Sequence, residues 1–541
     1  MKNNDNRQDQ FTARQIPSPE GQTEIARNVY KTEEVTTQAS VKEVVQQDQP
    51  ETPLSEGLQQ EVTQENIGSP QSVLTDQVLT QEQGVQQGVN QALPRKKGGL
   101  SKKLGIFAIF FVLILAGLFV VYKFQAGKIG KLFGNKGEIV WWGIMEEESV
   151  IKPLIDEFQE DNPDIKIVYK RQSSQDYRVR LTNSLAGGKG PDIFEFHNSW
   201  VPMYFNELST IPNQIMSQSE FSQTFYSIIV SDLLTKEGLV GIPLFYDAMT
   251  LYINEDLFAS VLKQPPTTWN ELGDLVNPDT GVLTLTDDRG AIIQSGVAIG
   301  KTENIDFWQD LLGVMMSQNG ADLKKPTDSQ AFDAVSFYLE IGKDVWDESL
   351  PQSTAAFAQG AVAMYFGPSR KAYDIAGMNS NLRFRTVPLP QLPKNFPTDL
   401  DVTYATYWVQ GVWNKSTNKE EAWRFLRFLS ERTSLEKINS ERKTVRNFEL
   451  ASPRMDMARM YLQDPILSSV VSQATNARSW YLADETYDGE TGINSKVAAF
   501  YEEVLNSKDK PEEALEEMAP GLARVLSQYG VVRITPTPEK K

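Results

Sequence analysis

The chain has 541 residues, with 71 acidic and 53 basic side chains that give a formal net charge of −18. This charge argues against a nucleic-acid-binding protein, because neutralising phosphates takes a surplus of Lys and Arg. The sequence contains no cysteine, which excludes disulfides, thiol catalysis, cysteine-type zinc sites and a lipid anchor on cysteine. Its one histidine, His197, excludes His-rich metal sites, and we expect neither a metal nor another cofactor.

Both ends of the chain are predicted to be disordered. Residues 1–94 are rich in Gln, Glu, Ser, Thr and Val and hold a single Tyr and a single Phe. So little apolar surface cannot offset the entropy cost of ordering the chain. We therefore expect a disordered, slightly acidic N-terminal tail, and a second, short disordered tail at 531–541.

One transmembrane helix is predicted within residues 95–137, which also supply a basic flank and a linker. Residues 104–122 form a run of 19 residues without a charge. As a helix this run would reach about 28 Å, close to the roughly 30 Å thickness of a hydrocarbon core. It lies too far along the chain for an ordinary cleaved signal peptide. Five basic residues precede it and four follow it closely, so the positive-inside rule only slightly favours a cytoplasmic N-terminal tail.

From residue 138 onward, strand-like and helix-like patterns alternate. Short apolar runs predict strands, and apolar residues at i, i+3, i+4 and i+7 predict amphipathic helices. Ser149 is a candidate N-cap for the first helix, and Asn162-Pro163 ends it. The strands fall at 138–143, 164–170 and 191–196, and the helices at 149–163 and 175–188. This order predicts a parallel sheet covered by helices.

The carboxyl ends of these three strands form a candidate ligand-binding edge. Ligands of open parallel sheets bind beyond that edge. The strand ends carry Trp, Asn, hydroxyl and amide groups, a mixture typical of binding sites, in the segments 142–144, 172–174 and 197–200. His197 belongs to the third segment, and we interpret it as a hydrogen-bonding partner of a ligand or as a surface histidine.

Seven fragments follow one another along the body of the chain. They are "WWG…IKPLIDEFQEDNPDIKIVY", "LAGGKGPDIFEF", "GLVGIPLFYDAMTLYINEDLF", "PPTTWNEL", "SGVAIGKTENIDFW", "FAQGAVAMYFGPS" and "NKEEAWRFLRFLS". In this order they resemble the extracellular solute-binding proteins of family 1, the maltose-binding-protein-like receptors of ABC importers. The resemblance covers about residues 138–530.

The resemblance implies an α/β fold with two lobes, the periplasmic-binding-protein-like fold of the class II type, with mixed sheets flanked by helices. The first lobe is expected at about 138–247 and 402–450, and the second at about 248–400 and 451–530. The ligand would lie in the cleft between them, and closure about a hinge would trap it.

Local signals in the fragments agree with this reading. Asn254 can cap a helix that begins with Glu255 and Asp256, and Thr268 begins a capping box. "LYIN" is expected to be a core strand. The turn 367–369 opens a helix whose free N–H groups are expected to face the cleft.

Aromatic and polar side chains near predicted strand ends or loops are the candidate ligand-binding groups. Flat aromatic faces pack on the C–H faces of sugar rings, while Asp, Asn and Glu bond the hydroxyl groups. Each aromatic residue also fits core packing, and we expect about half of them at the cleft. Tyr246 and Asp247 fall near the hinge. The candidates are Trp142, Glu146, Asn198, Trp200, Tyr246, Asp247, Phe366, Tyr407, Trp408 and Trp480; no catalytic residue is predicted.

The favoured hypothesis is a non-enzymatic receptor that delivers a sugar or oligosaccharide to ABC permease subunits. We expect a monomer at the cell membrane with a single-pass helix, a cytoplasmic tail and an extracytoplasmic binding domain, and no nucleic-acid partner. A membrane-anchored glycan-acting enzyme and a sensory ligand-binding domain remain the alternatives. An enzyme would need a pair of carboxylates in the cleft, about 5–10 Å apart.

Overall fold

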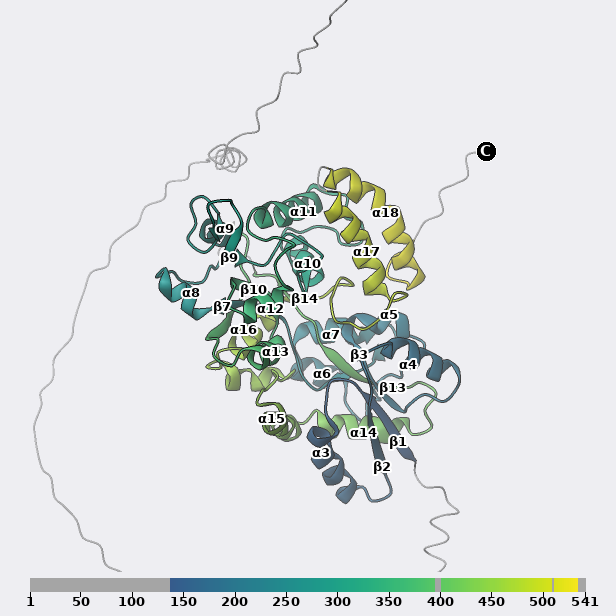
Figure 1. Cartoon of the computed structure of the whole chain (residues 1–541). Helices are drawn as coiled ribbons and strands as arrows, with labels where there is room; N and C mark the ends of the chain where they lie inside the picture. The colour runs from purple at the N-terminus through teal and green to yellow at the C-terminus, as the bar shows by residue number, and fades with distance from the viewer. Residues whose placement is uncertain (1–136, 395–399, 508–509, 534–541) are drawn as a thin grey trace, which may run out of the picture. The chain divides into compact units, whose positions relative to one another are not determined.

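The framework of the protein consists of two five-stranded mixed sheets, seen in the computed structural model (Figure 1). The structure describes residues 137–394, 400–507 and 510–533. The predicted N-terminal tail, the predicted transmembrane helix at 104–122 and all but three residues of the predicted C-terminal tail lie outside these ranges. Within the described ranges, none of the helices combines the length and the hydropathy needed to cross a membrane.

The first sheet confirms the predicted alternation of strands and helices. Its order is β2-β1-β3-β13-β6; β1 pairs in parallel with β2 and β3, and β13 runs antiparallel to β3 and β6. Ser149 does not cap the first helix, which begins one residue earlier after Glu147. The elements are β1 (Glu138–Gly143), α3 (Glu148–Asp161), β2 (Lys166–Arg171), α4 (Tyr177–Ala186), β3 (Ile193–His197), β6 (Ile242–Pro243) and β13 (Trp408–Val412).

The second sheet has the order β11-β7-β10-β9-β8. Its strand β7 contains "LYIN", and all six of its residues are buried, which confirms the predicted core strand. Asn254 caps α8 by accepting the N–H groups of Asp256 and Leu257, and Thr268 forms the predicted capping box of α9 with Glu271. The elements are β7 (Met249–Asn254), α8 (Glu255–Ser260), α9 (Trp269–Val276), β8 (Leu285–Thr286), β9 (Ile292–Val297), β10 (Val362–Pro368) and β11 (Phe384–Val387).

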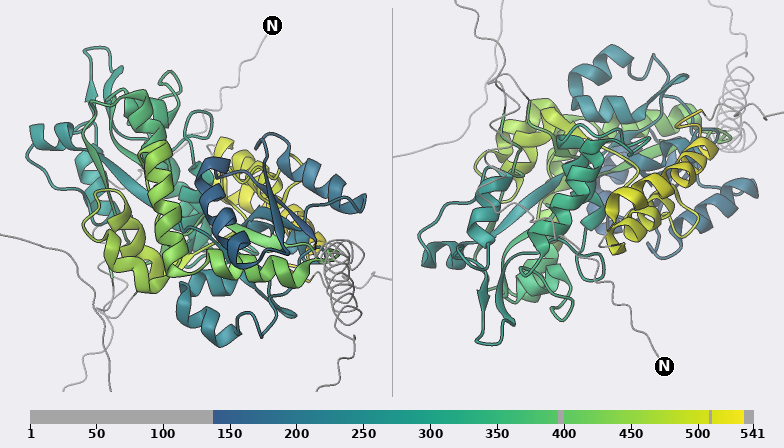
Figure 2. Two further views of the ribbon diagram at one scale, coloured as in Figure 1. Left: turned by 90° about the horizontal axis from the view of Figure 1, so that it is seen from below. Right: turned by 90° about the horizontal axis from the view of Figure 1, so that it is seen from above.

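Helices and short strands surround the two sheets. In α14 the predicted apolar stripe of Ala422, Phe425, Leu426 and Leu429 is buried, and α17 packs against α18 (Figure 2). The remaining helices are α5 (Val201–Tyr204), α6 (Gln218–Thr224), α7 (Ser227–Leu233), α10 (Trp308–Gln318), α11 (Ser329–Gly342), α12 (Ser353–Ala358), α13 (Lys371–Met378), α14 (Lys419–Leu429), α15 (Arg432–Arg446), α16 (Leu467–Gln473), α17 (Ile493–Asn506) and α18 (Pro511–Gln528). The short strands are β4 (Leu234–Thr235), β5 (Gly238–Leu239), β12 (Thr403–Tyr404) and β14 (Ala477–Arg478), and the 3₁₀ helices are η1 (Asn198–Trp200), η2 (Met455–Tyr461) and η3 (Ala474–Asn476).

Two hydrophobic cores divide the described residues. The first core draws its buried residues from 139–248 and 405–477, and the second from 249–404 and 482–526. The chain therefore passes from one core to the other three times. These cores differ most from the lobes predicted from the sequence at 451–477, whose buried residues pack with the first core.

We call the three places where the chain passes between the cores the crossings; they lie at 248–249, 404–405 and 477–482. The three crossings are hydrogen-bonded to one another. Ala248 bridges to Ala405, Thr406 N–H donates to the Asp247 carbonyl at 3.1 Å, and β12 pairs in parallel with β14. Because all three crossings lie together, rotation of one core against the other would bend a few residues of backbone rather than a packed element, which is the usual form of a hinge.

Candidate functional site

A cavity of about 690 Å³ is lined by residues that flank both cores. The first core contributes the carboxyl ends of β1 and β2, through Ile144 and 172–174, as the rule for open sheets predicts. The second core contributes the start of α13 and the loop before α17. A cavity of this size and position is suited to a small solute.

Buried Glu195 fixes the turn that brings Ile144 and Met145 to the cavity. Its Oε2 accepts the N–H groups of Ile144 at 2.7 Å and Met145 at 3.0 Å. Burial raises the pKa of Glu195 to about 7, although these N–H groups oppose the shift. A side chain of the neighbouring strand β3 therefore fixes the turn after β1.

Three arginines of the first core line the cavity. Arg442 on α15 is almost fully buried and forms an ion pair with Glu146, with 2.6 Å between its Nη2 and the carboxylate. Arg171, at the end of β2, pairs with Glu147 at 2.7 Å. Arg446, one turn after Arg442, donates to the Met145 carbonyl. These contacts fix the guanidinium groups around the turn after β1.

On the second core, Arg370 and Lys371 at the start of α13 line the cavity. Glu485 accepts from both, at 3.2 Å from Arg370 Nη2 and 2.5 Å from Lys371 Nζ. Burial alone would raise the pKa of Glu485, but the positive charges of Arg370 and Lys371 lower it below its ordinary value. Glu485 is therefore ionised at neutral pH.

Asp247, in the first crossing between the cores, lies directly behind Arg370. Its carboxylate accepts the backbone N–H groups of Ser369 at 2.9 Å and Arg370 at 3.2 Å, and it pairs with the Arg370 guanidinium at 3.3 Å. The prediction that the N–H groups of this turn are free to face the cleft is therefore wrong at Ser369 and Arg370. The Asp247 carboxylate of the first crossing accepts them instead.

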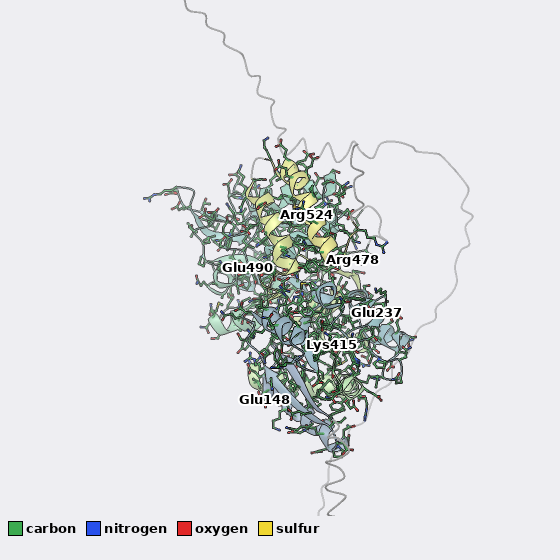
Figure 3. All side chains as sticks on the ribbon, turned by 90° about the vertical axis from the view of Figure 1, so that its right-hand side faces the viewer. Glu148, Glu237, Lys415, Arg478, Glu490 and Arg524 are labelled. Carbon is green, nitrogen blue, oxygen red and sulfur yellow. The ribbon has the colours of Figure 1, made fainter. Side chains whose placement is uncertain are left out.

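A loop at 483–492 connects the second core to the first across the cavity. Tyr487 stacks on Trp408 with 5.9 Å between ring centroids, and the Arg178 side chain of α4 donates to Asp488 and Thr491. Glu485 and Tyr487 both have φ of 50°, in the left-handed region that is uncommon for such residues. Figure 3 labels Glu490 in this loop. The loop thus holds Glu485 and Tyr487 at the cavity at the cost of backbone strain.

The cavity combines these charges with aromatic surface. Trp408 is covered, whereas Tyr487 and Tyr373 are 38% and 46% exposed. Its carboxylates are all paired: Glu147 with Arg171, Asp374 with Lys371, and Glu485 with Arg370. A carboxylate pair engaged in general acid–base catalysis needs one free acid and one free base, so this arrangement is suited to binding.

Comparison with known proteins identifies the family. The family model of the bacterial extracellular solute-binding proteins matches residues 142–433. The chain belongs to this family. Its members are solute-binding receptors and not enzymes, as the sequence led us to expect.

Individual relatives are distant. Binding proteins of Brucella abortus and Brucella suis are 23% identical over 291 residues, which are 50% of this chain and 66% of each relative. The chain therefore matches just under two thirds of the length of these relatives.

Solved structures of solute-binding proteins share the fold. An ABC transporter solute-binding protein of Thermotoga lettingae bound to α-D-tagatose has a TM-score of 0.55 at 20% identity, over 72% of this chain and 99% of the other. An ABC substrate-binding protein of Listeria monocytogenes in complex with cycloalternan has a TM-score of 0.56 at 18% identity, with the same coverage. A cyclic α-maltosyl-1,6-maltose binding protein of Arthrobacter globiformis has a TM-score of 0.57 at 17% identity, again over 72% and 99%. These likenesses establish the two-sheet α/β fold.

Few of the ligand-binding residues predicted from the sequence of this solute-binding protein lie at the cavity. Trp408 lines the cavity. Glu146 does not line it but pairs with Arg442, which does. Asp247 pairs in the same way with Arg370. Trp200, Tyr246 and Phe366 are buried in the cores, and Trp142 and Trp480 pack against them partly buried. Asn198 and Tyr407 both donate to partly buried Asp232. A ligand-binding role for each of these residues stays a prediction.

None of the charged residues that line the cavity was among the sequence-predicted candidates; they are Glu147, Arg171, Arg370, Lys371, Asp374, Arg442, Arg446 and Glu485. Two signals were available. Arg370 and Lys371 directly follow a strand and its Gly-Pro-Ser turn, and Arg442 and Arg446 are spaced i, i+4 on one helix face. Neither signal says that the two pairs meet, because their elements lie on different cores.

We predict that Tyr246→Ala destabilises the fold by about 3–5 kcal/mol, as expected for removing a buried aromatic ring. Tyr246 is fully buried, and its ring packs against Tyr226 and Tyr407 at 5.0 and 5.9 Å between centroids. Tyr246→Phe keeps the ring and should change the free energy of unfolding by less than about 1 kcal/mol. Denaturant unfolding of the full-length chain measures both. A small loss for the alanine variant would place Tyr246 outside the core.

His197 predicts a pH dependence of stability. It is not a surface histidine: its ring is buried, with Ser199 Oγ at 2.8 Å from Nδ1 and Thr406 Oγ1 at 3.0 Å from Nε2. Burial, with the charge of Arg370, lowers the pKa of His197 from 6.5 to about 3. Below about pH 6.5 the unfolded chain therefore binds a proton that the folded chain does not. The stability that neutral His197 provides is complete above that pH and is lost as the pH falls toward 3.

We expect the wild-type chain to lose up to about 1.4 kcal/mol per pH unit more than His197→Gln between pH 6 and pH 4. Both chains share the same carboxylates, so the difference between their unfolding free energies isolates the imidazole. Parallel pH profiles would show that His197 takes up a proton in the folded state.

Proposed function

We propose that this solute-binding protein is a membrane-anchored, extracytoplasmic receptor of an ABC importer that captures a sugar or oligosaccharide between its two cores. The observation that carries the proposal is the cavity itself, which is lined from both cores by charged groups and aromatic rings. Carbohydrates present C–H faces to aromatic rings and hydroxyl groups to charged and amide groups. The saccharides in the similar structures from Thermotoga lettingae and Listeria monocytogenes support the same class of solute.

We take the two cores as the two lobes of the receptor and the three hydrogen-bonded crossings as its hinge. A ligand that bonds Arg171 or Arg442 on one core and Lys371 on the other stabilises the conformation in which these groups are close. The ligand shifts the equilibrium between open and closed forms by its difference in affinity for the two. The closed form then presents a distinct surface to the permease subunits, to which the receptor binds as a monomer.

The anchor in this proposal is the uncharged run at 104–122, with its basic flanks. It places residues 1–94 in the cytoplasm and the binding domain, from residue 138, on the outer side. This anchor would tether the receptor beside its permease without a lipid-modified cysteine, which the sequence lacks.

A thermal-shift screen of the full-length chain in mild detergent tests the solute class. We expect saccharides to raise the melting temperature, since a ligand at 100 times its Kd adds about 2.7 kcal/mol to stability, whereas peptides and polyols should not. Stabilisation by peptides or polyols alone would refute the carbohydrate assignment. Hydrolysis of a saccharide in the same tube would refute the receptor function.

Single cysteines test the orientation, because the native chain has none. Glu237 is exposed on the binding domain (Figure 3), and Ser55 belongs to the predicted tail. In intact cells a membrane-impermeant maleimide should label Glu237→Cys and leave Ser55→Cys unlabelled until the cells are lysed. Deletion of 104–122 should move the protein from the membrane fraction to a soluble fraction. The opposite labelling pattern would place the binding domain in the cytoplasm.

A further inference from the structure

We propose that the solute is an acidic saccharide, one that carries carboxylate, sulfate or phosphate groups. This inference rests on the proposed function and narrows its substrate class. The cavity is lined by five basic side chains, Arg171, Arg370, Lys371, Arg442 and Arg446, and by three acidic ones, Glu147, Asp374 and Glu485. The chain as a whole has a net charge of −18, so a positive surplus in its cavity runs against the overall composition.

Each of the two most buried arginines of the cavity has one acidic partner that stands behind it and does not line the cavity, and Arg370 has a second partner, Glu485, that does line it. Glu146 is 4% exposed and holds Arg442, and Asp247 is fully buried and holds Arg370. An acidic residue in this position orients a guanidinium group and offsets part of the cost of burying it. Both arginines also line the cavity, where an anion can reach them.

Arg442 also keeps hydrogen-bonding capacity. Its Nε donates to Glu146 Oε1 at 2.8 Å and its Nη1 to Asn439 at 2.7 Å. Its Nη2 lies 2.6 Å from the same Glu146 oxygen, but its N–H bonds have no aligned acceptor among the described residues. A buried donor of this kind gains most from a charged acceptor.

The residue types favour an anion over a neutral sugar. Four of the five basic groups are arginines, whose planar fork binds carboxylate, sulfate or phosphate through two parallel hydrogen bonds. The exposed rings of Tyr487 and Tyr373 border the same cavity and supply the flat surface for the sugar itself. The site therefore offers separate partners for the ring and for the charge.

The test compares acidic oligosaccharides with neutral forms of the same sugars. The probes are trisaccharides of galacturonate, glucuronate and mannuronate beside their methyl esters, and sulfated galactose oligosaccharides and sugar phosphates beside their unmodified forms. Calorimetric titration of the full-length chain should show at least tenfold tighter binding for an acidic member than for its neutral partner. The uronate, sulfate and phosphate arms identify the charged group. Raising the salt concentration from 50 to 500 mM should weaken the acidic pairing and leave neutral saccharides unaffected.

Arg171→Gln and Arg446→Gln identify the groups responsible. Both side chains are partly exposed, so these variants should fold. Each should lose about tenfold or more of the affinity for the acidic saccharide and little for its neutral partner. Arg383→Gln is the matched control, since Arg383 pairs with Asp256 on the surface and does not line the cavity; its affinity should equal that of the wild type.

The outcomes separate this inference from the function on which it rests. Equal or tighter binding of the neutral partner overturns the acidic-saccharide proposal and leaves the carbohydrate receptor intact. Equal losses in Arg383→Gln and the two cavity variants also overturn it, because the effect would then be one of general charge. Failure of every saccharide in the panel to bind overturns both proposals.

Discussion

The ion pair between Asp247 and Arg370 is the contact on which the rest of the site depends. Asp247 lies where the chain first leaves the first core, and it binds the turn between β10 and α13 through two backbone N–H groups and one guanidinium. Arg370 continues the chain of contacts to Glu485, whose loop carries Tyr487 onto Trp408. Removing one member of a buried pair leaves an uncompensated charge, which typically costs 3–5 kcal/mol. One crossing residue therefore positions both the charged wall and the aromatic wall of the cavity.

A similar arrangement recurs on the first core. Glu146 holds Arg442, and Glu195 holds the turn after β1 through the N–H groups of Ile144 and Met145. In each case a buried carboxylate sits one layer beneath the cavity and orients the groups that line it, much as second-layer groups orient the ligands of a metal site. The acidic composition of the chain is thus compatible with the basic lining of its cavity, because some of the acidic side chains orient the basic side chains that line it.

The fold could be predicted from the sequence because its signals are local. The period of the apolar residues located β1 to β3 with their helices, and capping residues such as Asn254 and Thr268 located helix starts to within a residue. The cavity could be predicted only as an edge of the first sheet. Its charged partners are far apart in the sequence, 123 residues for Asp247 and Arg370 and 296 for Glu146 and Arg442. Aromatic residues misled for a related reason: a strand end can face the cleft or the core, and Trp200 and Tyr246 face the core.

The most direct test of capture by closure is the distance between the two cores, measured with and without solute. Because the chain has no native cysteine, spin labels can be placed at Lys189→Cys on the first core and Asp333→Cys on the second, both at exposed positions. Pulsed electron–electron double resonance on the full-length chain would report the distribution of distances between the two labels. We predict that a saccharide that raises the melting temperature shifts this distribution to shorter distances and narrows it. An unchanged distribution in the presence of bound saccharide would contradict capture by closure between the two cores.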